Sequence, residues 1–242
     1  MRGHRHLRSA VPTKREIQSE PLPSAGKIEK DPMKSKIEPR RVPVQGRSRR
    51  RVEAILGAAR DLVREVGWVD LKMKDIALRA GVPIGSVYQY FPNKNAIIVA
   101  IAKRYFAVIQ EMVSERLEAA NDLRSLRAEF GALLEDLFKF TREDVVFREI
   151  WTGTEADREI ESVNVEDSRQ SALTLAKRIV ELGGASADDP TIATRCFMIA
   201  HLGGSLARTT FSIEPEEITM LEQAFISMAL DHLFSVSNPS KA

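Results

Sequence analysis

The polar side chains with the most informative spacing in this 242-residue chain lie between Pro83 and Pro92. Val87 and Phe91 stand four positions apart, which is the spacing of neighbours on one helical face, so we expect both to point inward. The opposite face then carries hydroxyl and amide groups that can donate and accept hydrogen bonds. This face predicts recognition chemistry, with packing of the tyrosines in a core as the alternative, and it consists of Ser86, Tyr88, Gln89 and Tyr90.

Residue types that would support catalysis or metal binding do not come together in the sequence. It contains no P-loop, no G-x-G-x-x-G segment, no G-x-S-x-G and no H-E-x-x-H. His4 and His6 lie near the N-terminus, and His201 and His232 are isolated, so no metal site is expected. We therefore expect no enzyme and no cofactor, with an all-α enzyme as a remote alternative.

Charge is distributed unevenly along the chain, although 36 Lys and Arg against 34 Asp and Glu leave a net charge of only +2. Residues 1–46 hold 11 basic and 5 acidic side chains, and residues 47–94 hold 10 and 5. Residues 95–242 hold 15 and 24. A basic front and an acidic back indicate that the front meets a polyanion. A solvated basic tail without a partner is the alternative.

The composition of the first 46 residues, the single cysteine and the lack of long apolar stretches indicate the cellular location that we expect for the protein. Six of the 11 prolines fall in residues 1–46, where no apolar period is sustained, so we expect a disordered basic tail. The single cysteine, Cys196, fits a reducing compartment. No apolar stretch reaches the roughly 20 residues of a membrane span, and no apolar segment follows the basic N-terminus. The expected location is the cytoplasm, without membrane contact.

The elements that must position these side chains all have helical periodicity. Apolar residues recur at steps of three and four, and no alternating β-branched run bounded by hairpin turns is present. The predicted fold class is all-α, with about nine helices. The clearest helices cover residues 47–66, 73–80, 83–91 and 93–120, with others around 126–138 and 172–180 and others beginning at 188–190 and 215–217.

The second and third predicted helices form a candidate helix–turn–helix. The turn Ala80-Gly81-Val82-Pro83 supplies the small residue and the glycine that this geometry needs. Ile76 and Ala77 supply apolar contacts that hold the two helices together. Alone, this pattern is weak evidence, because two short helices joined at a glycine are common.

The wider string is far more specific. Lys74-Asp-Ile-Ala, followed by Ala80-Gly-Val-Pro-Ile-Gly-Ser-Val-Tyr-Gln-Tyr-Phe-Pro-Asn-Lys94, resembles the DNA-binding domain of the tetracycline-repressor (TetR) family. Ala58-Ala59, Leu62 and Gly67-Trp68 stand at that family's spacing in the supporting helix. After the tail over 1–46, the resemblance implies a helix-turn-helix domain over 48–108 and a ligand-binding and dimerisation domain over 109–242.

The resemblance also implies a function. Such a regulator is a homodimer that places the third helix of each subunit in the major groove of a pseudo-palindromic operator on double-stranded DNA. A small molecule, here an apolar or amphipathic one, binds the C-terminal domain and releases the DNA. We therefore expect a sequence-specific transcriptional regulator, most often a repressor. The alternative is an architectural DNA-binding protein without an inducer.

The DNA contacts implied by the resemblance centre on the third helix. Gln89 can pair with adenine through both atoms of its amide, and Ser86 can bond a base or a phosphate. Lys72 stands where the family usually has a capping Ser or Thr, a loss of about 1 kcal/mol that a phosphate contact would offset. The arginines at 47 and 49–51 form a candidate arm before the first helix. The full set is Arg49, Lys72, Lys74, Ile84, Gly85, Ser86, Tyr88, Gln89, Tyr90 and Lys94.

Two further sets of residues are predicted in the C-terminal domain. Aromatic and polar side chains are candidates to line a ligand pocket, with a filled core as the alternative: Phe106, Phe130, Phe147, Trp151, Met198 and His201. Small residues that permit close helix approach are candidates for a four-helix dimer interface, with packing inside one chain as the alternative. This second set is Ala200, Gly203, Gly204 and Ala207, together with Leu221, Phe225 and Met228.

Overall fold

The computed structural model describes residues 46–153, 158–209 and 213–234, and every regular element within these ranges is a helix. The predicted all-α class is confirmed. The predicted tail lies outside the described residues, except for its last residue, which begins the first helix. The helices are α2 (Gly46–Val66), α3 (Met73–Arg79), α4 (Ile84–Tyr90), α5 (Lys94–Glu118), α6 (Leu123–Glu143), α7 (Val145–Gly153), α8 (Arg158–Glu181), α9 (Ile192–Thr209) and α10 (Pro215–Phe234).

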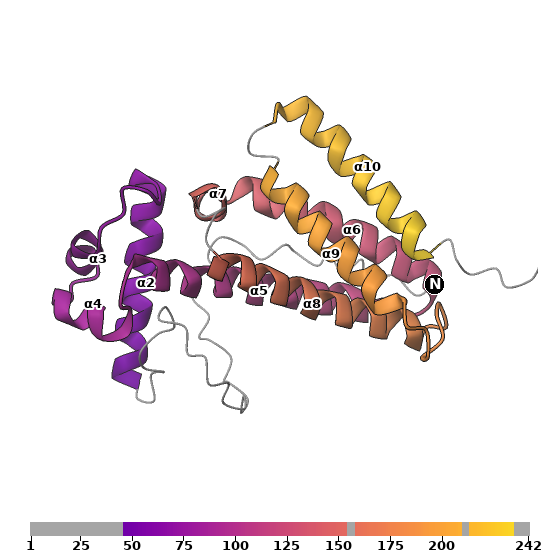
Figure 1. Cartoon of the computed structure of the whole chain (residues 1–242), viewed down its shortest axis with the longest axis horizontal. Coiled ribbons are helices and arrows are strands. Elements are labelled where there is room, and N and C mark those ends of the chain that lie inside the picture. The colour runs from indigo at the N-terminus through magenta and orange to yellow at the C-terminus, as the bar shows by residue number, and fades with distance from the viewer. Residues whose placement is uncertain (1–45, 154–157, 210–212, 235–242) are drawn as a thin grey trace, which may run out of the picture.

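The helices form two groups, which Figure 1 shows at opposite ends of the molecule. We call α2, α3 and α4 the head, and α6, α8, α9 and α10 the body. The long helix α5 runs from the head into the body, and the short helix α7 lies where the two meet. None of the described helices combines the length and the apolar character needed to cross a membrane.

The head is built around the apolar face of α2. Ile55, Ala59 and Val63 recur at steps of four and are fully buried. The helix ends where predicted, because Gly67 adopts a positive φ of 75° and donates its N–H to the carbonyl of Val63 at 3.0 Å. Ile76 of α3 is likewise fully buried in this core.

Helix α5 contributes to two separate hydrophobic cores. The side chain of Asn93 accepts a hydrogen bond from the N–H of Ala96 at 2.9 Å and caps the start of α5. The first half of α5 packs into the head core through residues such as Ile101, and the second half packs into the body core through residues such as Leu117. One continuous helix therefore joins the two cores.

The short helix α7 is an element that the sequence reasoning did not separate. Asp144 ends α6 by donating its N–H to the carbonyl of Phe140 at 3.2 Å. Its carboxylate then accepts the N–H of Phe147 at 2.9 Å, as a capping residue does, and the hydroxyl of Tyr105 at 2.7 Å. This buried aspartate separates α6 from α7 and fastens the start of α7 to α5.

Candidate nucleic-acid interface and ligand cavity

The turn between α3 and α4 has the backbone geometry that its sequence predicts. Gly81 adopts a φ of +65°, a conformation that favours glycine. Val82 donates its N–H to the carbonyl of Ala77 at 3.1 Å and closes the turn onto α3. The predicted inward face of α4 is confirmed, because Val87 and Phe91 are 0% and 1% exposed.

The opposite face of α4 is open to solvent over most of its length. Ile84 and Tyr88 are 42% and 46% exposed, and Gly85 and Gln89 are exposed as well. A Cβ placed on Gly85 would meet nothing within 4 Å, so this part of the surface is clear of the chain's own atoms. Ser86 is half-buried. Four side chains that can contact a ligand or base are thus available on one short helix.

Tyr90 does not belong to that face, and the expectation that it points outward is wrong. The side chain is only 4% exposed, and its hydroxyl lies 2.8 Å from the Ser48 hydroxyl on α2. A tyrosine can satisfy its hydroxyl from inside a core, which makes its direction ambiguous in a sequence. Tyr90 therefore fastens α4 to α2.

Helix α3 begins without the usual side-chain cap, as the sequence predicts. The backbone of Lys72 is extended, and its side chain makes no capping hydrogen bond. Lys72 and Lys74 are both exposed, so their ammonium groups are accessible to a phosphate. This arrangement keeps both lysines in the candidate interface.

Lys94 and the arginines near residue 47 have different surroundings from those expected. The Lys94 ammonium donates to the carbonyl of Val69 at 2.9 Å and lies 4.5 Å from the centre of the Trp68 ring. It therefore orders the loop after α2. Arg49 is exposed, but it and its neighbours form the first turns of α2, so the expectation of an arm before the first helix is wrong.

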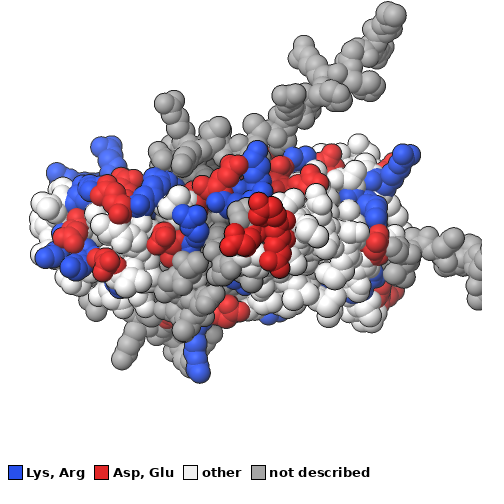
Figure 2. Space-filling view, turned by 90° about the horizontal axis from the view of Figure 1, so that it is seen from above, with Lys and Arg blue, Asp and Glu red and all other residues white. Residues whose placement is uncertain are grey.

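The charged side chains around the head are mixed in sign. Figure 2 shows Lys and Arg at the end of the molecule that holds α3 and α4, with acidic side chains among them. Some of these charges are paired, as in Arg79, whose guanidinium meets Glu65 at 2.7 Å. This hydrogen-bonded pair lowers the pKa of Glu65 from its ordinary value. The exposed lysines of α3 are accordingly the clearer candidates for phosphate contact.

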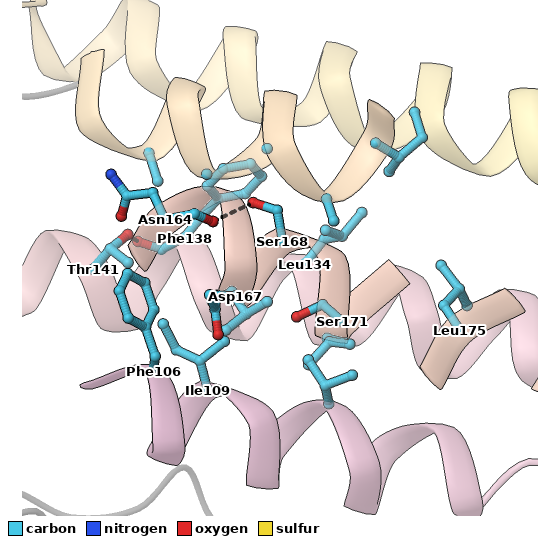
Figure 3. Close-up of a pocket in the computed structure, with 18 of the residues that line it drawn as sticks. Phe106, Ile109, Leu134, Phe138, Thr141, Asn164, Asp167, Ser168, Ser171 and Leu175 are labelled. Atoms are coloured by element: carbon cyan, nitrogen blue, oxygen red, sulfur yellow. Dashed lines mark hydrogen bonds between the residues drawn. The ribbon is translucent and has the colours of Figure 1, made fainter. Parts of the chain in front are cut away.

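A cavity of about 110 Å³ lies within the body, between α5, α6, α8 and α9. Figure 3 shows its walls, which are mostly aliphatic and aromatic. Four of the six predicted pocket residues line it: Phe106, Phe130, Phe147 and Trp151.

The other two predicted pocket residues do not line the cavity, and their placement there is corrected. Met198 is 41% exposed on the outer side of α9. His201 stacks on Phe197, with the ring centres 5.5 Å apart, and its Nδ1 lies 3.2 Å from the Ser168 hydroxyl. His201 therefore sits behind the wall of the cavity.

The strip of small residues on α9 faces the inside of its own chain, which corrects the dimer prediction for these positions. Gly203 lies against α10, because a Cβ there would come within 3.1 Å of the Phe225 ring. Phe225 is itself buried, edge-on to Phe138. Small residues permit close packing whether the second helix comes from the same chain or another, so their type does not decide between the two. The strip lines the cavity with Ala200, Gly203, Gly204 and Ala207.

A polar strip along α8 enters this apolar cavity, and the sequence reasoning missed it. Asp167 accepts a hydrogen bond from the Gln110 amide at 2.7 Å, and the same amide donates to the Ser171 hydroxyl at 2.7 Å. Burial raises the pKa of the Asp167 carboxyl to about 6. The signal available in the sequence was polar residues at steps of three and four on a helix with an apolar face: Asn164, Asp167, Ser168 and Ser171.

Helix α7 brings the cavity and the head into direct contact. Phe147 and Trp151 stack with ring centres 4.1 Å apart, and both belong to the head core as well as to the cavity wall. The Trp151 indole donates to the Asn164 amide oxygen at 3.1 Å. Two aromatic side chains are thus shared by the possible ligand site and the helices that position α4.

A surface-exposed helix–turn–helix joined to a helical body with an internal cavity defines a class of DNA-binding transcription regulators. Comparison with known families places the chain within that class. The model "Bacterial regulatory proteins, tetR family" matches residues 55–101, and the model "Tetracyclin repressor-like, C-terminal domain" matches residues 124–236. The chain belongs to the TetR family, whose members are DNA-binding regulators rather than enzymes.

Individual relatives agree with this assignment over most of the chain. An HTH-type transcriptional regulator encoded in the dhlA 5′ region of Xanthobacter autotrophicus is 25% identical over 186 residues, covering 76% of this chain and 90% of that protein. A TetR-family regulator from Streptomyces coelicolor superposes with a TM-score of 0.57 at 27% identity, covering 79% and 99% of the two chains. SmeT, the repressor of the Stenotrophomonas maltophilia multidrug efflux pump SmeDEF, superposes with a TM-score of 0.60 at 20% identity. The match covers 78% of this chain and 94% of SmeT.

Proposed function

We propose that this chain is a cytoplasmic homodimeric repressor that is released from a pseudo-palindromic operator when a small apolar or amphipathic molecule enters the cavity. The observation that carries the proposal is the shared position of Phe147 and Trp151, in both the cavity wall and the head core. A ligand that moves these rings also moves the helices packed against them, because close-packed interiors transmit displacement.

DNA reading is assigned to the exposed face of α4 and to the lysines of α3. Gln89 reads a base through its amide, while Tyr88 and Lys74 hold phosphates. The bare surface at Gly85 lets the start of α4 approach the duplex closely. Tyr90 is assigned to packing, and Lys94 to ordering the loop after α2.

Ligand binding is assigned to the cavity of the body. Its volume of about 110 Å³ is below the ~150 Å³ of an engineered cavity that holds benzene, so a larger molecule must push the walls apart. SmeT has been solved with triclosan, and a Thermus thermophilus FadR with lauroyl-CoA. These relatives share the fold at 20% and 19% identity, so the ligand of this chain is argued from its own cavity.

Dimerisation is assigned to the outer faces of the last two helices. Four large apolar side chains are exposed there, in rows four or eight positions apart on each helix. Apolar side chains gathered on a surface in this way mark an association site. They are Met198 and Leu202 on α9 and Met220 and Met228 on α10.

The competing function is architectural binding to DNA of any sequence without an inducer. Selection of bound fragments from genomic DNA, followed by footprinting and salt titration, separates the two. We expect one short protected palindrome, and Gln89→Ala should relax the base preference at one position in each half-site. Equal affinity for every duplex, with the steep salt dependence of phosphate binding, would establish the architectural function instead.

A further inference from the structure

The cavity wall contains an acidic side chain that forms no ion pair among the residues that the structure describes. Asp167 lies on α8 among the side chains of the cavity wall (Figure 3). Its one hydrogen-bond donor from another element is the neutral amide of Gln110. Within the part of the chain that the structure describes, no Lys, Arg or His lies within ion-pair distance of this carboxylate.

An isolated carboxylate in such a place is costly to keep. Burial disfavours the charged form and raises the pKa of Asp167 to about 6, yet at neutral pH the group is still mostly ionised. A cation bound beside it would interact favourably with the carboxylate in this partly desolvated site. Phe106 and Trp151 also line the cavity, and aromatic rings can attract a cation within it.

The geometry points to a lipophilic cation as the ligand of this cavity: a molecule with an apolar part and an ammonium-type charge held by Asp167. The inference rests on the proposed ligand-released repressor and specifies the chemistry of its inducer. Arg208, at the end of α9, also lines the cavity and donates to the Ser205 hydroxyl at 2.9 Å. An anionic probe therefore measures the competing attraction of that guanidinium.

Three probes of nearly equal shape test the charge preference. They are the phenethyltrimethylammonium cation, its neutral carbon isostere 3,3-dimethylbutylbenzene, and the 2-phenylethanesulfonate anion. Their affinities are measured by calorimetry on the full-length protein and on two variants. Asp167→Asn removes the charge and keeps the shape, while Glu166→Gln makes the same change on a side chain that is 62% exposed.

We expect the wild type to prefer the cation to the anion. The ratio of cation to neutral affinity should fall at least tenfold in Asp167→Asn and stay within twofold in Glu166→Gln. An unchanged ratio in Asp167→Asn, tighter binding of the anion, or no binding of the cation would each overturn the inference.

A parallel titration with the selected DNA fragment keeps this inference separate from the proposed function. Cation binding that depends on Asp167 but leaves the DNA bound would refute release by ligand and uphold the charge preference. Release by the neutral probe at equal strength in the wild type and in Asp167→Asn would uphold the repressor and refute the cationic inducer.

Discussion

At the scale of single residues, Asp167 links the cavity to the stability of the whole protein. The pKa of its carboxyl rises from 3.8 in the unfolded chain to about 6 in the folded protein. At a pH between these two values, the folded protein keeps a proton on Asp167 that the unfolded chain has lost. Below about pH 4 the carboxyl is neutral in both states and does not lower the free energy of unfolding. That free energy falls as the pH rises through 6, because the buried carboxyl becomes charged. The folded protein is therefore less stable when Asp167 is charged than when it is neutral.

Asp167→Asn should remove this pH-dependent cost. We expect the variant to raise the free energy of unfolding by up to about 3 kcal/mol at pH 7.5 and to have little effect at pH 4. Urea unfolding of the wild type and the variant at the two pH values measures the difference. Glu166→Gln should show no such dependence on pH. An equal gain at both pH values would mean that the charge of Asp167 is not its source.

Gln89 is the residue at which sequence preference can be separated from affinity. Gln89→Ala should cost about 1–3 kcal/mol on the preferred operator and relax the preference at one base pair in each half-site. Lys74→Ala is the comparison, because loss of a phosphate contact weakens binding to all sequences alike and lowers the salt slope. Titration of an operator variant set measures both effects. Identical profiles for the two variants would contradict these roles.

At the scale of elements, two glycines of the helix–turn–helix should respond in opposite ways to the same substitution. Gly81→Ala places a side chain at a φ of +65° and should destabilise the protein by about 1 kcal/mol. Gly85→Ala adds a methyl group to open helical surface, so it should keep or raise the melting temperature while weakening DNA binding. Thermal melts and binding titrations of both variants measure this. Undiminished DNA binding by Gly85→Ala would remove the start of α4 from the interface.

The helices of the head could be predicted from the sequence because the apolar periodicity agrees there with the glycines that follow α2 and α3. The apolar face of α2, the turn at Gly81 and the inward pair Val87 and Phe91 each have a local cause that acts on neighbouring residues. The break at Asp144 was harder to predict, because an aspartate within a helical stripe is equally compatible with a solvated surface. Its buried carboxylate accepts a hydrogen bond from the Tyr105 hydroxyl, 39 positions away in the chain, and local spacing does not reveal that contact.

The parts of the site that sequence reasoning misplaced are residues whose chemistry suits two environments. Tyr90 satisfies its hydroxyl inside the protein through Ser48, although the same group would suit a phosphate. Gly203 suits a neighbouring helix of either subunit, and only the ring of Phe225 from its own chain decides which. The strip containing Asp167 faces inward because α8 is covered by both α5 and α9. The helical spacing of its polar residues groups them on one face, but only this long-range packing makes that face an inner one.

At the scale of the whole molecule, association should depend on the exposed methionines and leucine of the last two helices. The double variant Leu202→Glu, Met228→Glu places charge in this apolar surface and should convert the dimer to a folded monomer with at least tenfold weaker operator binding. Analytical ultracentrifugation and DNA titration measure both effects. Leu173→Glu is the control, because Leu173 is a 51% exposed leucine on α8. A double variant that still sediments as a dimer would place the interface elsewhere.

Residues of α7 and α8 line the same cavity but differ in whether they also pack in the head core. This difference matters for re-engineering such a protein as a biosensor. The side chains of Asp167 and Ser171 reach the cavity without entering the head core, whereas Phe147 and Trp151 belong to both. On the proposed mechanism, a library that randomises the first pair should change which ligand binds and keep the release of DNA. A library that randomises the aromatic pair should impair that release as well as change the ligand.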